Sequence, residues 1–119
     1  DHSRIPITTG RAPRPEDAYA AADLVVFPSS WEGFGNPVIE GTIAGRPVAV
    51  ASYPVLDELV SLGLDLFSVD DPARVASWLQ NPDSDLLESN RACLHANFDL
   101  ADLPDRIRTA FTAIGWDAW

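Results

Sequence analysis

The sequence predicts an α/β domain with a parallel sheet, and three observations support this prediction. Two short apolar runs, at 24–27 and 47–51, have the composition of strands that are buried on both faces. The segment between them contains Asn36-Pro37, a helix start signal, and ends at Gly45, a stop signal. Two strands joined by a helix form a βαβ unit, which is nearly always parallel and right-handed. We therefore expect a three-layer domain with about three or four short strands.

The rest of the chain adds helices and one more strand to this unit. Asp71-Pro72 predicts a capped helix start, and Pro82 predicts a break between two helices. In chain order, the remaining expected elements are a β-like run at 5–9 that Pro6 limits to a sheet edge, a helix at 16–22, a helix at 55–62, a strand at 64–69, a helix at 72–80, a helix at 83–98 and a helical tail from Asp99. We expect Val75, Trp78 and Leu79 to point inward from the helix at 72–80.

The helical tail has one apolar face, formed by Leu100, Leu103, Ile107, Phe111 and Ile114. Such a face needs a partner surface. Either the same domain or a second domain would provide one, and Trp116 and Trp119 extend the apolar character.

Length and charge limit what the chain can do. Its 119 residues suit one domain, 1–119, and are too few for a two-domain enzyme. The formal net charge of −10, with 8 Lys and Arg together, argues against a surface for nucleic acid or anionic membrane. The single cysteine excludes an internal disulfide, and we find neither a membrane span nor a signal peptide. We therefore expect a cytoplasmic location.

The loop before the central helix has the features of a phosphate site. Gly33 and Gly35 lack a Cβ, so they can take positive φ and let backbone amides approach a ligand. Asn36 is a favoured N-cap, and Pro37 suits the first helical position. Free N–H groups and the helix dipole would together favour an anion.

Two acids flank this helix start. Glu32 lies in the loop, and Glu40 lies at about the fourth position of the helix. A fixed carboxylate accepts paired hydrogen bonds from adjacent hydroxyls, so a sugar or a ribose suits these acids better than phosphate does. A tight turn with solvated acids remains the alternative interpretation. We expect no metal site, because no His/Cys spacing for one exists, and we assign Cys93 and His95 to packing and surface.

The segment from about Asp17 to Val50 resembles a known family. Its two glutamates are separated by seven residues, which include Gly-Phe-Gly, and Gly-Arg-Pro-Val-Ala-Val follows at 45–50. Tyr-Ala-Ala-Ala-Asp-Leu at 19–24 and Pro-Ser at 28–29 belong to the same pattern. The pattern closely resembles the group 1 glycosyltransferases of the GT-B fold, which are retaining enzymes that use nucleotide sugars.

The resemblance implies a partial C-terminal, donor-binding domain of the GT-B fold, with a Rossmann-like sheet. It implies that Glu32 is catalytic and contacts the donor sugar, and that Glu40 contacts the ribose. Together the implied donor-binding residues are Glu32, Gly33, Phe34, Gly35, Asn36, Pro37 and Glu40. Two departures are Gly41 in place of Ala, and Ser-Tyr-Pro at 52–54 in place of a Gly-rich loop; we expect neither to touch the two acids.

The expected reaction is glycosyl transfer with retention from a nucleotide diphospho-sugar, with no cofactor. The basic residues that clamp the diphosphate in this family, and the N-terminal acceptor domain, would lie elsewhere in a parent chain. We therefore expect this chain to be inactive alone. Two alternatives are a non-catalytic nucleotide-sugar-binding module and an α/β scaffold for protein contact.

Overall fold

The computed structural model describes residues 14–116. The elements are α1 (Pro15–Ala21), β1 (Val25–Phe27), α2 (Asn36–Ile43), β2 (Val48–Val50), α3 (Leu56–Ser61), β3 (Phe67–Ser68), α4 (Pro72–Gln80), α5 (Ser84–Phe98), the 3₁₀ helix η1 (Leu100–Asp102) and α6 (Leu103–Ala113). Each helix and strand expected between residues 16 and 98 is therefore present. The β-like run at 5–9 lies outside the described residues.

The three strands form one parallel sheet in the order β1-β2-β3. Val25 is paired with Val48, and Ala49 is paired with Phe67. The βαβ unit predicted from the sequence is thus confirmed. The central strand β2 is buried along its whole length, as its continuous apolar run indicates.

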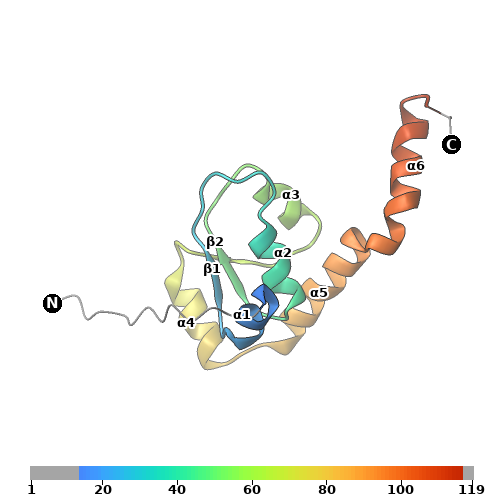
Figure 1. Cartoon of the computed structure of the whole chain (residues 1–119). Coiled ribbons are helices and arrows are strands. Elements are labelled where there is room, and N and C mark those ends of the chain that lie inside the picture. The colour runs from blue at the N-terminus through green and yellow to red at the C-terminus, as the bar shows by residue number, and fades with distance from the viewer. Residues whose placement is uncertain (1–13, 117–119) are drawn as a thin grey trace.

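Helices cover both faces of this sheet, which gives the expected three layers (Figure 1). Alternation along a strand places Val25 and Val48 on one face and Val26 and Ala49 on the other. The first pair packs against Gly41 of α2, where an added Cβ would lie 3.1 Å from a methyl group of each valine. The second pair lies on the side of α4, in a hollow that Val75 and Leu79 also line.

The layer on the side of α4 is less complete than the sequence suggests. The side chain of Val26 is 55% exposed, although its strand was expected to be buried on both faces. Leu79, which was expected to point inward, is 42% exposed. The reason is that α4 packs beside β3, at the far edge of the sheet from β1.

A buried amide ties α5 to the sheet. Asn90 is 5% exposed and makes two hydrogen bonds with the backbone of Asp65. Its Nδ2 donates to the carbonyl of Asp65, and its Oδ1 accepts from the N–H of Asp65, both at 2.8 Å. Asp65 lies two residues before β3, so these two hydrogen bonds hold α5 next to that strand.

The final helix projects away from the domain (Figure 1). It packs on η1, and Arg106 donates from Nη2 to the carbonyl of Ala96 in α5 at 2.9 Å. The apolar side chains along this segment stay exposed: Leu100, Leu103, Ile107, Ile114 and Trp116. We call these five residues the apolar face of α6. These side chains are exposed, so residues 14–116 of the same domain do not provide the partner surface that this face was expected to need.

Candidate functional site

The predicted site lies at the carboxyl ends of β1 and β2. These strands are parallel neighbours, and Phe27 is paired with Val50 at their last positions. The loop at 28–35 follows β1, and the loop at 51–55 follows β2, so both leave the sheet at the same edge (Figure 1). Ligands of open parallel sheets bind at this edge.

The start of α2 differs from the prediction. Gly35, with φ 88° and ψ 52°, is the residue that precedes the helix, and Asn36 and Pro37 are its first two residues. The side chain of Asn36 therefore does not cap α2, and no other side chain does. The physical reason lies in Tyr53: a Cβ at position 35 would overlap the Tyr53 hydroxyl, and the positive φ also favours glycine.

Tyr53 packs under the loop at 28–35 and contacts its last two residues, Phe34 and Gly35. It follows β2, is 3% exposed, and donates its hydroxyl to the carbonyl of Phe34 at 3.4 Å. Burial, and to a lesser extent the negative charge of Glu32, raise the pKa of Tyr53. Glu32 thus acts on Tyr53 through its charge, whereas the hydrogen bond of the Tyr53 hydroxyl is to Phe34, so the expectation that the segment 52–54 does not touch the two acids stays a prediction.

The sequence pattern assigned no role to Tyr53. The signal that could have found it is its position directly after β2, because neighbouring parallel strands deliver their next residues to the same edge.

The second contact on the loop comes from α5. The rings of Phe34 and Phe98 meet edge to face, with centroids 5.8 Å apart. Phe34 is thus held by α5 while Gly35 rests on Tyr53. Gly33 differs from Gly35: it has no positive φ, and a Cβ added there would meet nothing within 4 Å. Open space above Gly33 leaves room for a ligand beside its amide.

Glu40 lies one turn into α2 and faces α1. It lines a cavity of about 440 Å³ between the two helices, together with Pro15, Glu16, Tyr19, Ala20, Ile43 and Ala44. Burial raises the pKa of Tyr19 to about 12, with further contributions from the interaction of its hydroxyl with Glu40 and from the charge of Glu40. The structure therefore brings Glu40 and Tyr19 together at one cavity, which Glu32 does not line.

Comparison with known proteins supports the family resemblance noted for the segment at 17–50. A family model for group 1 glycosyl transferases matches residues 3–81, which is more than half of the chain. The chain belongs to the group 1 glycosyltransferases. No solved structure matches it.

Among curated relatives, this glycosyltransferase chain is 42% identical over 93 residues to a D-inositol 3-phosphate glycosyltransferase of Thermobispora bispora. That match covers 71% of this chain and 22% of the relative. A mannosylglucosylglycerate synthase of Petrotoga mobilis is 40% identical over 58 residues, which cover 48% of this chain and 14% of the relative. The glycosyltransferase chain thus spans only a small part of these relatives.

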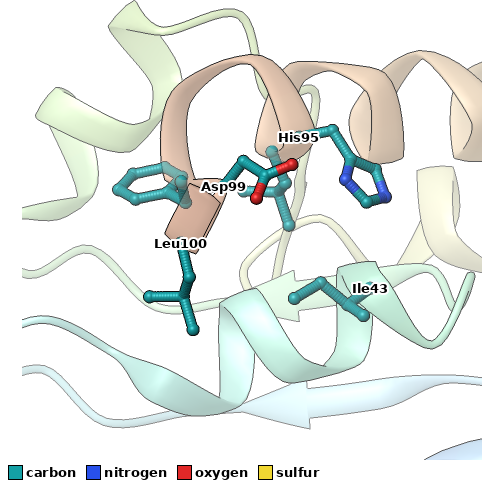
Figure 2. A pocket seen from close by; sticks show the side chains of 6 residues that line it. Ile43, His95, Asp99 and Leu100 are labelled. Atoms are coloured by element: carbon teal, nitrogen blue, oxygen red, sulfur yellow. The ribbon is translucent and has the colours of Figure 1, made fainter. Parts of the chain in front are cut away.

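A smaller cavity of this glycosyltransferase chain, about 250 Å³ in volume, lies between α2 and the end of α5 (Figure 2). Figure 2 shows His95 of α5 and Asp99, which directly follows α5, across from Ile43 of α2. Both polar side chains are exposed, and none of the predicted donor-binding residues lines this cavity. Cys93, in the same helix, donates its thiol to the carbonyl of Leu62 at 3.1 Å. These contacts suit packing rather than catalysis.

Metal-binding clusters and membrane-crossing helices are both absent from residues 14–116. This part of the glycosyltransferase chain contains no group of three or more His, Cys, Asp or Glu residues that could hold a metal ion. It also contains no helix of the length and hydropathy that crossing a membrane requires.

Proposed function

We propose that this chain is the donor-binding part of a retaining glycosyltransferase that moves a sugar from a nucleotide diphospho-sugar to an acceptor. One observation carries the proposal: Glu32, the amides at 33–36 and Glu40 follow each other along one loop and helix start at the carboxyl end of the sheet. Their order matches the order of sugar, diphosphate and ribose along such a donor. The family membership supports the transferase class.

The acid at each end of this row has a distinct task. Glu32 would accept hydrogen bonds from the hydroxyls of the donor sugar, beside the reacting carbon, and is the catalytic residue of the proposal. Glu40 would accept hydrogen bonds from the ribose. Ionised carboxylates suit both tasks because they are acceptors only and can receive two donors at once.

The amides between the acids would hold the diphosphate. Pro37 has no N–H, and the N–H of Val38 donates to the carbonyl of Gly35 at 2.9 Å. The remaining amides of this turn, from Gly33 to Asn36, lie next to the positive end of the helix dipole, which attracts anions. Because α2 has no side-chain cap, no capping side chain among residues 14–116 competes with a ligand for these groups.

The chain contains no lysine, and no arginine within residues 14–116 forms an ion pair with either acid of the site. Arg14, Arg74, Arg106 and Arg108 pair with Asp17, Asp65, Asp102 and Asp105, and Arg46 donates to the carbonyl of Ala20. A charge that develops on a leaving diphosphate needs positioned positive charge, which is usually the largest catalytic contribution. The proposal therefore includes a phosphate clamp from another part of the parent protein, and no turnover by this chain alone.

The acceptor domain of the parent is part of the same proposal. The relatives are several times longer than the region they share with this chain. The apolar face of α6 has no partner surface within residues 14–116, and we propose that it lies against that N-terminal acceptor domain. A cytoplasmic location and the absence of a cofactor remain predictions.

The exposed face of α6 also favours a second candidate function. A non-catalytic module could retain the nucleotide-sugar site and use α6 for contact with another protein. The two candidates differ in turnover by the full-length protein.

A donor screen by calorimetry and activity assay on the full-length parent tests the proposal. We expect one nucleotide sugar to bind and to be turned over, with turnover reduced in Glu32→Gln and affinity reduced in Glu40→Gln. Glu58→Gln, on the exposed side of α3, is the matched control and should change neither quantity. Donor binding without turnover would favour the non-catalytic module, and no binding of any nucleotide sugar would contradict the proposal.

A further inference from the structure

We propose that Tyr19 is a positioning residue, which holds the Glu40 carboxylate in the orientation in which it accepts hydrogen bonds from a ribose. The inference rests on the proposed function, because it explains what supports the acid to which we assign the ribose. The structural feature that carries it is the cavity between α1 and α2.

The lining of this cavity places one hydroxyl opposite one acid. Helix α1 contributes Tyr19 and Glu16, and α2 contributes Glu40; the other lining residues are apolar. The volume of about 440 Å³ falls within the range of small-molecule sites. Among the side chains of this cavity, the Tyr19 hydroxyl is the one that can donate a hydrogen bond to Glu40.

Glu40 needs such a partner to serve as a ribose ligand. Its side chain is long and exposed, so holding it in one orientation costs conformational entropy. No ion pair of residues 14–116 includes Glu40. A carboxylate that is already oriented loses less freedom when the ligand arrives, which favours binding.

Tyr19 is suited to hold the acid because it is itself held. Its ring packs against the core cluster, while its hydroxyl lies toward α2. The end of α1 is fixed by Arg46, whose Nη2 donates to the carbonyl of Ala20 at 2.7 Å. Since Arg46 follows α2 by three residues, the contact ties the helix that carries Tyr19 to the segment that carries Glu40.

The protonation state of Tyr19 fits this role. With a pKa of about 12, the phenol keeps its proton at neutral pH and can donate it to the carboxylate. A carboxylate has two oxygens with about four acceptor positions, so one hydrogen bond from Tyr19 leaves capacity for both hydroxyls of a ribose.

The test measures ribose preference in the full-length parent. The probes are UDP and GDP, each compared with its 2′-deoxy form by calorimetry, and the preference is the Kd of the deoxy form divided by the Kd of the ribose form. We expect Tyr19→Phe to lower this preference roughly 3- to 10-fold, as for the loss of one hydrogen bond of ordinary net strength. The double variant Tyr19→Phe with Glu40→Gln should have the same ribose preference as Glu40→Gln alone. Glu58→Gln, on the exposed side of α3, is the matched control and should keep the preference of the wild type.

Each other outcome has a definite meaning. If Tyr19→Phe keeps the full preference while Glu40→Gln loses it, the ribose role of Glu40 stands and the role of Tyr19 is wrong. If the two losses add, Tyr19 acts independently of Glu40 and the inference is again wrong. If neither the wild type nor Glu40→Gln distinguishes ribose from deoxyribose, the proposed function of Glu40 itself fails.

A measurement on the wild-type protein covers the case in which Tyr19→Phe does not fold. The ¹³Cζ resonance of Tyr19 reports on the environment of its hydroxyl. Saturation with the ribose nucleotide should shift this resonance, and saturation with the 2′-deoxy form should shift it less. Equal shifts with both nucleotides would overturn the inference.

Discussion

Helices α2 and α4 both have a proline in their first turn, but their first amides have different partners. The side chain of Asp71 caps α4 and accepts a hydrogen bond from the N–H of Arg74 at 3.0 Å. Helix α2 begins after Gly35, which has no side chain to accept such a bond. The start of α4 is thus capped by a side chain of its own sequence, and the start of α2, at the carboxyl end of the sheet, has no side-chain cap, as the proposed diphosphate site requires.

The substitution with the largest expected effect is at Gly35, the residue that precedes α2. Gly35→Ala places a Cβ against the Tyr53 hydroxyl and imposes a left-handed backbone on a residue that disfavours it. We expect a loss of about 2–4 kcal/mol in the free energy of unfolding, measured by urea denaturation of the chain.

Two further variants of this turn separate the steric overlap with the Tyr53 hydroxyl from the backbone strain at position 35. Gly33→Ala is the matched control and should cost less than about 1 kcal/mol, because a Cβ there meets no atom within 4 Å. Tyr53→Phe removes the overlapping oxygen and should recover part of the stability that Gly35→Ala loses. If Gly33→Ala were as destabilising as Gly35→Ala, the account of this turn would be wrong.

The next effect concerns the ligand that the open helix start is proposed to bind. Glu32→Gln in the full-length parent should reduce transfer by about 2–3 kcal/mol in transition-state free energy, as for the loss of one well-placed polar group. Affinity for the sugar nucleotide should fall, while affinity for the bare nucleoside diphosphate should stay unchanged. Calorimetry with both ligands and steady-state kinetics measure these quantities. An equal loss of affinity for both ligands would place Glu32 away from the sugar.

Most of the fold followed from local sequence signals. Buried strands such as β2 read as continuous apolar runs, and the signals at Asp71-Pro72 and Gly45 mark a real helix start and a real helix end. These features depend on neighbours in the chain, so the sequence alone was sufficient.

The features that were missed depend on contacts between distant segments. Tyr53 leaves no room for a Cβ on Gly35, the residue that precedes α2, although it lies 18 residues further along the chain. Asn90 is a polar residue within a helix, and its burial follows only from its two hydrogen bonds with the backbone of Asp65. Val26 is apolar, but it is exposed because α4 covers the opposite edge of the sheet. None of these contacts has a periodic signature in the sequence.

The cap of α4 gives a smaller and well-defined effect. Asp71→Ala removes the acceptor for the N–H of Arg74 and should cost about 1 kcal/mol of stability. Urea denaturation of the chain measures it, and Asp71→Asn, which keeps an acceptor oxygen, should recover most of the loss. An unchanged midpoint in Asp71→Ala would show that water replaces this cap without cost.

The smallest expected effect is that of Asn36→Ala, and it is the sharpest test of the comparison. A residue that caps a helix through its side chain costs about 1 kcal/mol when it is replaced by alanine. Asn36 is instead the first residue of α2 and makes no capping bond, so the change should cost less than about 0.5 kcal/mol, as an exposed substitution does. Diphosphate binding should also persist, because the proposed ligand contact is the backbone N–H, which alanine retains. Parallel denaturation of Asn36→Ala and Asp71→Ala makes the comparison direct: equal losses would mean that both helix starts are capped alike, and α2 would then have no open amides to offer to a donor.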